Sequence, residues 1–335
     1  MGIVYATTMN RFPTQVPVDH SRHSCEPCSR RYEPEVPCIP CKLPPTPGNP
    51  GTFEEIHKKM TDLNPPIFEG MKLLVRKPLS SHFKVDHTLT LSSVTPSGYK
   101  FGTSYTGTKR IGEKEKYPIA TGDITSNGNM TANFVHTFGC RFRTKFSAQI
   151  ANNKYKAARL TTEYRSDNCT LSLSMAEPNF IKQHGTMVFH YLQSITSRIA
   201  LGCEVACHRG LKVPGGQQSI MSGALRYSTG FLTFSTTLGE AGLHLSCHTK
   251  ASRQLQIGAE ININMRTHES IGTLVFRLDV PHADMVFRGI VNSNTTVGAV
   301  FEKKLYPIQE SSLVISAMLN HVKQQCRVGI GLNIG

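Results

Sequence analysis

Apolar and polar side chains alternate along this chain from about residue 68 to the last residue. The stretch that begins at Arg253 shows the alternation clearly. Its apolar positions are Leu255, Ile257, Ala259, Ile261 and Ile263, and its polar positions are Gln254, Gln256, Glu260, Asn262 and Asn264. Because successive side chains of a strand point to opposite faces, this period of two predicts a strand with one apolar face and one wet face. Residues 243–248 and 327–334 repeat the pattern.

Segments of roughly 9 to 12 residues carry this pattern, and turn-forming residues separate them, as at 95–98, 126–128, 214–216 and 281–282. We count about nineteen such segments. A tilted strand needs about 9 to 11 residues to cross the hydrocarbon layer of a membrane, whereas strands of a soluble β-sandwich are about five or six residues long. The sequence therefore predicts an all-β fold, a transmembrane β-barrel of about nineteen strands over residues 67–335. Val275 and Val286 depart from the alternation, because they fall on the face expected to be wet.

A short amphipathic helix is predicted at residues 51–66, before the first strand. Thr52 and Glu55 have the spacing of a capping box at its start, and Pro65-Pro66 ends the helical pattern. Its apolar face consists of Phe53, Ile56, Met60 and Leu63. Such a helix packs on a core or lies on a membrane surface, and the acidic residues on its polar face favour packing on a core.

Residues 1–50 contain ten of the nineteen prolines. This composition cannot bury a core and predicts a disordered arm. Two Cys-x-x-Cys pairs lie in the arm, Cys25 with Cys28 and Cys38 with Cys41. Their spacer is short for a zinc ribbon and has little hydrophobic support, so we expect solvated thiols and no bound metal. The first residues lack the apolar run and cleavage site of a secretory signal, so we expect no secretory leader.

The distribution of charge and apolar residues excludes several classes of protein. The formal net charge is +14, but Lys and Arg recur singly and no basic cluster is interleaved with aromatic side chains. We therefore expect no nucleic-acid partner. Every apolar run is broken well before the 18 or so residues of a transmembrane helix. The sequence contains no nucleophile elbow, phosphate loop or His-Glu-x-x-His site, so we expect neither an enzyme nor a cofactor.

Several longer motifs resemble the channel-forming subunit of the translocase of the outer mitochondrial membrane. They are NPGTFEE at residues 49–55, YKFG at 99–102, HYLQSIT at 190–196, HTKASRQLQIGAE at 248–260 and EKKL at 302–305. The resemblance covers residues 49–335. It implies the nineteen-stranded barrel of the mitochondrial porins, with the first and last strands paired in parallel and the short helix inside the lumen.

This resemblance also implies a function, a protein-conducting channel that imports unfolded, presequence-bearing precursors across the mitochondrial outer membrane. The implied partners are those precursors, small helical translocase subunits, presequence receptors, the barrel-assembly machinery, outer-membrane lipid and further copies of the chain. The alternative is a metabolite channel of the same barrel class, which passes nucleotides and other anions. The chain departs from the family pattern at Asn292-Ser-Asn-Thr295, where the family usually carries Asp and Trp, and it contains no tryptophan. It therefore resembles a diverged paralogue.

The last predicted strand carries a second motif. Arg327, Gly329, Leu332 and Ile334 resemble the signal read by the mitochondrial machinery that inserts barrels. The motif makes physical sense, because a polar lumen residue, a glycine that permits close backbone approach and two lipid-facing apolar residues suit a strand that pairs with a template.

Carboxylates on the wet face are the candidate residues for guiding cargo. The alternation assigns Glu163, Glu204, Glu260, Asp284 and Glu302 to the lumen, with Asp279 at a strand end. A basic presequence would be attracted to such an acidic wall. Basic residues share the same wall, namely Lys84, Arg159, Arg277, Arg288 and Lys304. The expected lumen therefore has mixed charge.

Overall fold

A computed structural model describes the chain from residue 49 to residue 335, except for residues 95, 111–115, 153, 180–183, 211–213, 241 and 307–310. The predicted Pro-rich arm and its Cys-x-x-Cys pairs lie outside the described residues, apart from Asn49 and Pro50. Nineteen strands form one sheet in the described part of the chain. They are β1 (Gly70–Pro78), β2 (Phe83–Leu91), β3 (Gly98–Arg110), β4 (Lys116–Thr125), β5 (Met130–Phe138), β6 (Phe142–Ala151), β7 (Lys154–Arg165), β8 (Cys169–Asn179), β9 (His184–Ser194), β10 (Ile199–Arg209), β11 (Gln217–Thr229), β12 (Leu232–Gly239), β13 (Gly242–Lys250), β14 (Leu255–Asn264), β15 (Glu269–Val280), β16 (Met285–Asn292), β17 (Thr296–Lys304), β18 (Ser312–Asn320) and β19 (Gln325–Ile334).

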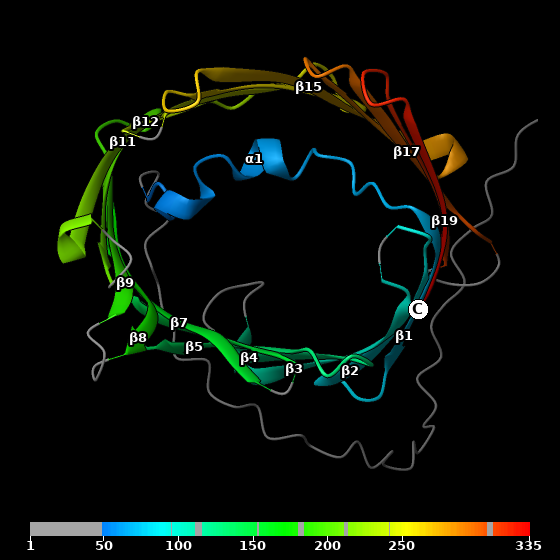
Figure 1. The fold of residues 1–335 in the computed structure, drawn as a ribbon, viewed down its shortest axis with the longest axis horizontal. Helices are drawn as coiled ribbons and strands as arrows, with labels where there is room; N and C mark the ends of the chain where they lie inside the picture. The colour runs from blue at the N-terminus through cyan, green and yellow to red at the C-terminus, as the bar shows by residue number, and fades with distance from the viewer. Residues whose placement is uncertain are drawn as a thin grey trace, which may run out of the picture. The chain divides into compact units, whose positions relative to one another are not determined.

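The strands follow a meander that closes into a barrel (Figure 1). Each strand pairs antiparallel with the next along the chain, and β1 also pairs with β19. Because an odd number of alternating strands leaves the first and the last running in the same direction, this closing pair is parallel, from Gly70 opposite Gly329 to Val75 opposite Ile334. The structure thus confirms the predicted barrel of nineteen strands and its parallel closing pair.

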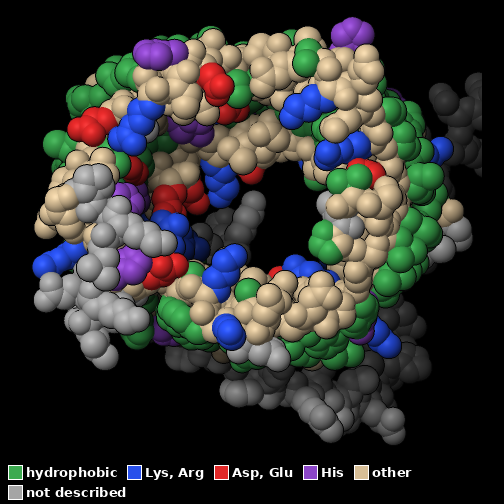
Figure 2. Space-filling view, viewed as in Figure 1, with side chains coloured by type: hydrophobic (Ala, Val, Ile, Leu, Met, Phe, Trp, Pro, Cys, Tyr) green, Lys and Arg blue, Asp and Glu red, His purple; other side chains and the backbone are tan. Residues whose placement is uncertain are grey.

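The two faces of the barrel differ as the alternation predicts. Large apolar side chains on the outer face are exposed, among them Ile261, Leu274 and Ile330 at 46%, 49% and 53%. Such a face suits contact with lipid. Figure 2 shows charged side chains around the central opening and apolar side chains along the outer rim. In the part of the chain that the structure describes, no helix is both long enough and apolar enough to cross a membrane.

The segment before β1 is less helical than predicted, although it lies inside the ring of strands (Figure 1). The single helix expected at residues 51–66 is divided into η1 (Phe53–Glu55) and α1 (Lys58–Thr61). The expected capping box is also absent, since the side chain of Thr52 makes no capping hydrogen bond and the carboxylate of Glu55 pairs with Lys58 at 3.2 Å. The segment bonds to the barrel wall along its length, and these contacts replace the regular hydrogen bonds of a longer helix.

Candidate functional site

The candidate site is the inner wall of the barrel together with the segment that crosses it, residues 49–69, which we call the luminal segment. At its start, the Asn49 amide donates to the backbone oxygen of Ser166 at 2.7 Å and accepts from the Thr170 hydroxyl at 3.2 Å, close to the turn between β7 and β8. At its end, the Phe68 backbone bonds to the Ser316 hydroxyl of β18 through both its N–H and its oxygen, at 3.1 and 2.9 Å. The luminal segment therefore extends along the wall from β8 to β18 before the chain enters β1.

The apolar face predicted for this segment is the face that packs on the wall. Phe53, Ile56, Met60 and Leu63 are all buried, with at most 9% exposure. Phe53 and Ile56 pack against Leu192, Ala200 and Ala224 of the wall, while Met60 and Leu63 pack against Val275 and Ile290. This packing explains why Val275 interrupts the polar pattern. It faces the lumen but meets the luminal segment instead of water, and its exposure is 0%.

Glycines in the wall make room for this packing. A Cβ atom added at Gly258 would lie 2.4 Å from the Met60 sulfur, and one added at Gly298 would lie 2.4 Å from Ile67. Gly202 has the same relation to Phe53, at 3.1 Å. A glycine at a wet-face position inside an alternating strand indicates close approach of another group, and Gly258 could have been recognised in the sequence on that ground.

His57 is the main polar anchor of the luminal segment. Its ring nitrogens bond to the hydroxyls of Ser246 at 2.7 Å and Thr237 at 2.8 Å, and its ring stacks on His244 with 3.9 Å between centroids. His244 in turn bonds to Glu260 at 2.8 Å. Burial, together with the nearby His244, lowers the pKa of His57 from 6.5 to about 4, although Glu260 acts in the opposite direction. A neutral imidazole donates with one nitrogen and accepts with the other, and a hydroxyl group can serve either nitrogen.

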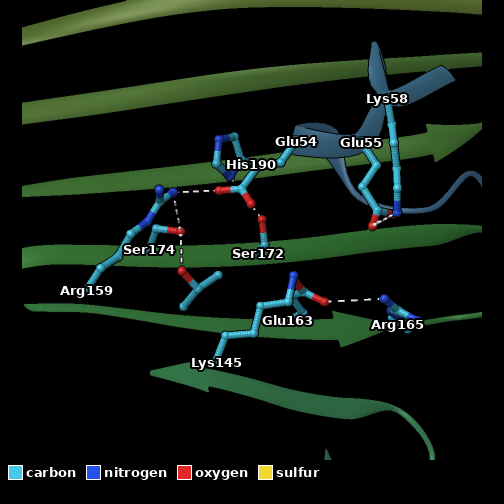
Figure 3. A network of polar contacts seen from close by, with 11 residues as sticks. Glu54, Glu55, Lys58, Lys145, Arg159, Glu163, Arg165, Ser172, Ser174 and His190 are labelled. Carbon is cyan, nitrogen blue, oxygen red and sulfur yellow. Dashed lines mark hydrogen bonds and ion pairs between the residues drawn. The ribbon is translucent and has the colours of Figure 1, made fainter. Parts of the chain in front are cut away.

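A second polar network holds the start of the luminal segment (Figure 3). The Phe53 ring stacks on His190 of β9, with 5.0 Å between centroids. The two nitrogens of His190 bond to the Ser172 hydroxyl at 3.0 Å and to Glu204 at 2.9 Å, which fixes the imidazole plane. Glu54 forms an ion pair with Arg159 of β7 at 2.5 Å. Sequence reasoning missed His190, because a lone histidine in a strand carries no signal that it meets a distant aromatic ring.

Five of the six predicted lumen carboxylates lie on the inward face, and most of them are paired with a base. Glu163 is almost fully buried and forms ion pairs with Lys145 and Arg165. Asp279 pairs with Arg277 at 2.9 Å. Glu204 and Glu260 bond to His190 and His244, as described above. These four carboxylates therefore link neighbouring side chains of the wall as well as adding negative charge to it.

The remaining two predicted carboxylates differ from that group. Glu302 accepts a hydrogen bond from the Ser312 hydroxyl at 3.2 Å, and no base among the described residues pairs with it. Asp284 was expected on a strand, but it lies in the turn after η3 (Pro281–Ala283) with φ of 49°. The alternation that assigned Asp284 to the lumen does not reach it, because the period of two ends with β15.

The part of the wall formed by β1 to β6 is more basic. Its carboxylates are in ion pairs, Asp86 with Arg76 at 3.7 Å and Asp123 with Lys100 at 2.9 Å. On the same face Lys72, Lys84 and Arg143 make no ion pair with any described residue within 4.0 Å. This half of the lumen therefore presents positive charge to whatever passes. The described residues also contain no cluster of metal-ligating side chains.

The predicted insertion motif occupies β19 at the parallel seam. Gly329 and Gly331 lie beneath the Phe68 side chain, and a Cβ atom at Gly329 would be 2.4 Å from the Phe68 backbone oxygen. Arg327 lies 3.7 Å from Glu69. Leu332 and Ile334 are opposite Leu73 and Val75 of β1 on the outer face, as the alternation predicts.

A closed barrel with an apolar outer face and a wide polar lumen defines a pore-forming membrane protein. Comparison with known proteins gives the family. The eukaryotic porin family matches residues 49–329. The chain belongs to that family.

Within the family, the chain is similar to proteins named as mitochondrial import receptor subunits. It is 46% identical over 287 residues to "Mitochondrial import receptor subunit TOM40 homolog 2" of Drosophila melanogaster, a match that covers 86% of this chain and 84% of that protein. It is 40% identical over 287 residues to the TOM40 homolog of Homo sapiens, covering 86% and 78%. Among solved structures, a Rhodopseudomonas blastica porin aligns with a TM-score of 0.43 and 12% identity, over 69% of this chain and 95% of that chain.

Proposed function

We propose that this chain is the protein-conducting channel through which unfolded, presequence-bearing precursors cross the mitochondrial outer membrane. The observation that carries the proposal is identity of 40 to 46% with import receptor subunits over 287 residues, a length that corresponds to the luminal segment and the whole barrel. The chemistry of the lumen supports it. The wall already holds a peptide, the luminal segment, by apolar contacts and by hydroxyl bonds to its backbone.

Attraction of a basic presequence would rest on few carboxylates. Glu302 has no basic partner among the described residues, and Asp62 of the luminal segment is exposed and likewise unpaired within that part of the chain. At physiological salt a charge acts over about 8 Å, so these local carboxylates outweigh more distant surface charges for a peptide that passes beside them. Of the other predicted carboxylates, Glu163 and Asp279 are neutralised by lysine or arginine partners, and Glu204 and Glu260 are bonded to histidines.

The basic half of the lumen favours a second candidate, an anion-conducting metabolite channel. Lys72, Lys84 and Arg143 would raise the local concentration of nucleotides and other anions. The two functions differ in what blocks the pore. A cargo channel is blocked by basic amphipathic peptides, whereas a metabolite channel is blocked by nucleotides.

Recording from the reconstituted chain in a planar bilayer distinguishes them. We expect transient block by a basic amphipathic peptide, and a several-fold weaker block in Glu302→Gln. Glu240→Gln is the matched control, because Glu240 is an exposed residue in the turn that follows β12. Block by ATP with indifference to the peptide would refute import and leave the metabolite channel.

We propose the wider assembly on the same basis. The exposed apolar outer face is the surface on which small helical subunits and further copies of the chain would pack, and the β19 motif is the signal for the barrel-assembly machinery. Presequence receptors would dock at the barrel ends. Gentle detergent extraction and native electrophoresis test this part, since a chain that migrates alone would contradict it.

A further inference from the structure

A cavity of about 230 Å³ opens from the lumen beside the end of the luminal segment. Its apolar lining consists of Pro66, Ile67, Phe68, Val286, Val300 and Val314. Val286 was the second residue to break the predicted polar pattern, and its place in this lining accounts for the break. The cavity is therefore an apolar recess in a wall that is otherwise polar.

Both hydrogen-bond donors and hydrogen-bond acceptors surround this apolar recess. Lys72 and Arg288 supply donors, Glu302 supplies a carboxylate acceptor, and the Asn333 amide supplies both. Neither Lys72 nor Arg288 forms an ion pair with a described residue within 4.0 Å. An apolar recess lined by both donors and an acceptor matches a peptide unit, which presents a side chain, a carbonyl oxygen and an N–H together.

The neighbouring wall shows the same recognition already in use. Phe68 lies over the glycines of β19, and the Ser316 hydroxyl bonds to both its N–H and its oxygen. Ser235 donates to the backbone oxygen of Ile56 at 3.1 Å beside another apolar contact. In each case an apolar side chain enters a recess while a polar wall group bonds to the adjacent peptide.

Size decides between a peptide side chain and a metabolite. Pockets for small molecules usually measure about 300 to 1,000 Å³. A cavity of about 230 Å³ is smaller than that range. It suits one large apolar side chain.

We propose that this cavity binds one apolar side chain of the polypeptide in transit, with the adjacent peptide unit bonded by Lys72 or Arg288 and by Glu302. The proposal rests on the proposed function and adds a substrate feature to it. The feature is an apolar residue of the passing polypeptide that need not be flanked by basic residues. Two cations, Lys72 and Arg288, stand at the rim against one carboxylate, Glu302, so a basic neighbour would gain nothing there. Precursor regions without basic residues would therefore still be held at the seam of the barrel.

Single-channel recording with two neutral peptides tests the proposal on the full chain. Both peptides consist of glycine and serine, and one carries a single central leucine in place of a serine. We expect the leucine peptide to dwell about tenfold longer, the order of magnitude that burial of one leucine side chain supports. Val286→Phe, which fills the cavity, should abolish the difference.

Val135→Phe is the matched control, because it adds the same volume to the inward face of β5, far from the cavity lining. It should narrow the pore while keeping the leucine advantage. An equal advantage in Val286→Phe and Val135→Phe, or no advantage in the unmodified chain, would overturn the proposal. If Val286→Phe forms no channels, Phe68→Ala provides the test, since the enlarged cavity should prolong the dwell time of a phenylalanine peptide relative to the leucine peptide; an unchanged ratio refutes the site.

A basic amphipathic peptide is the third probe. It distinguishes failure of the cavity proposal from failure of the proposed import function. Block by this peptide without any effect of Val286→Phe on the leucine advantage refutes only the cavity. Absence of block by this peptide, with block by ATP, refutes the import function on which the cavity proposal rests.

Discussion

The glycine at position 329 offers a quantitative test of how the luminal segment is joined to the barrel. In Gly329→Ala the new methyl carbon would lie 2.4 Å from the backbone oxygen of Phe68 and 2.8 Å from its ring. A backbone oxygen cannot rotate away as the end of a side chain can, so either β19 or residues 66–68 must shift. Overpacking of this kind costs about 1 to 3 kcal/mol. Loss of the two Ser316 bonds to Phe68 would add about 0.5 to 1.5 kcal/mol each.

Urea unfolding in lipid vesicles, followed by circular dichroism, measures this cost. We expect the free energy of unfolding to fall by about 2 to 6 kcal/mol in Gly329→Ala. Gly223→Ala on β11 is the control, because nothing lies within 4 Å of a Cβ atom there. Its stability should change by less than about 0.5 kcal/mol.

The same pair of variants distinguishes two roles of Gly329, close packing within the barrel and recognition by the machinery that inserts barrels. Purified lipid vesicles contain no assembly proteins, so a loss of stability there comes from the barrel itself. If Gly329→Ala unfolds at the same urea concentration as Gly223→Ala, close packing under Phe68 is not a source of stability. The glycine would then have to be explained by the insertion signal alone.

Three further predictions concern the faces of the wall and the luminal segment. Ile257→Arg on the outer face should cost about 2 to 4 kcal/mol near the bilayer midplane, while Gln256→Arg should cost little, and equal losses in a vesicle unfolding assay would reverse the assigned faces. Met60→Ala should weaken docking of the luminal segment by about 2 to 5 kcal/mol, seen as faster hydrogen exchange at residues 53–63. The lowered pKa of His57 means that the undocked segment binds the extra proton, so docking should be complete above pH 6.5 and should weaken as pH falls toward about 4. Exchange at residues 53–63 measures this too, and His57→Gln should remove most of the pH dependence.

Local patterns predicted most of the fold. The period of two in the stretch 255–264 follows from the pleat of a single strand, so it needs no knowledge of neighbouring strands. The apolar face of residues 53–63 was equally local, since side chains three and four residues apart share one face of a helical turn. The extent of the helix was not predictable in this way. Thr52 and Glu55 had the right spacing for a cap, but Glu55 bonds to Lys58 and the segment follows the wall.

The candidate site was predicted less completely, because its chemistry depends on pairing between distant residues. Alternation placed Glu163 and Glu260 on the inward face, yet it could not show that they meet Lys145 and His244. Those partners follow from the register of adjacent strands and from the tilt of the closed sheet. The direction of the Asp284 side chain could not be predicted in this way, since Asp284 lies in a turn and a turn has no alternation.

The sequence by itself determined that the chain forms many strands with one apolar and one polar face, because side-chain direction within a strand depends only on its own pleat. Only the tertiary structure decided which strands close the barrel, where the luminal segment docks, and which inward charges are neutralised. The parallel seam of β1 and β19 makes neighbours of residues that are far apart in the sequence, such as Gly70 and Gly329. Such contacts are set by the number and register of all the strands at once, so no local stretch of sequence contains them.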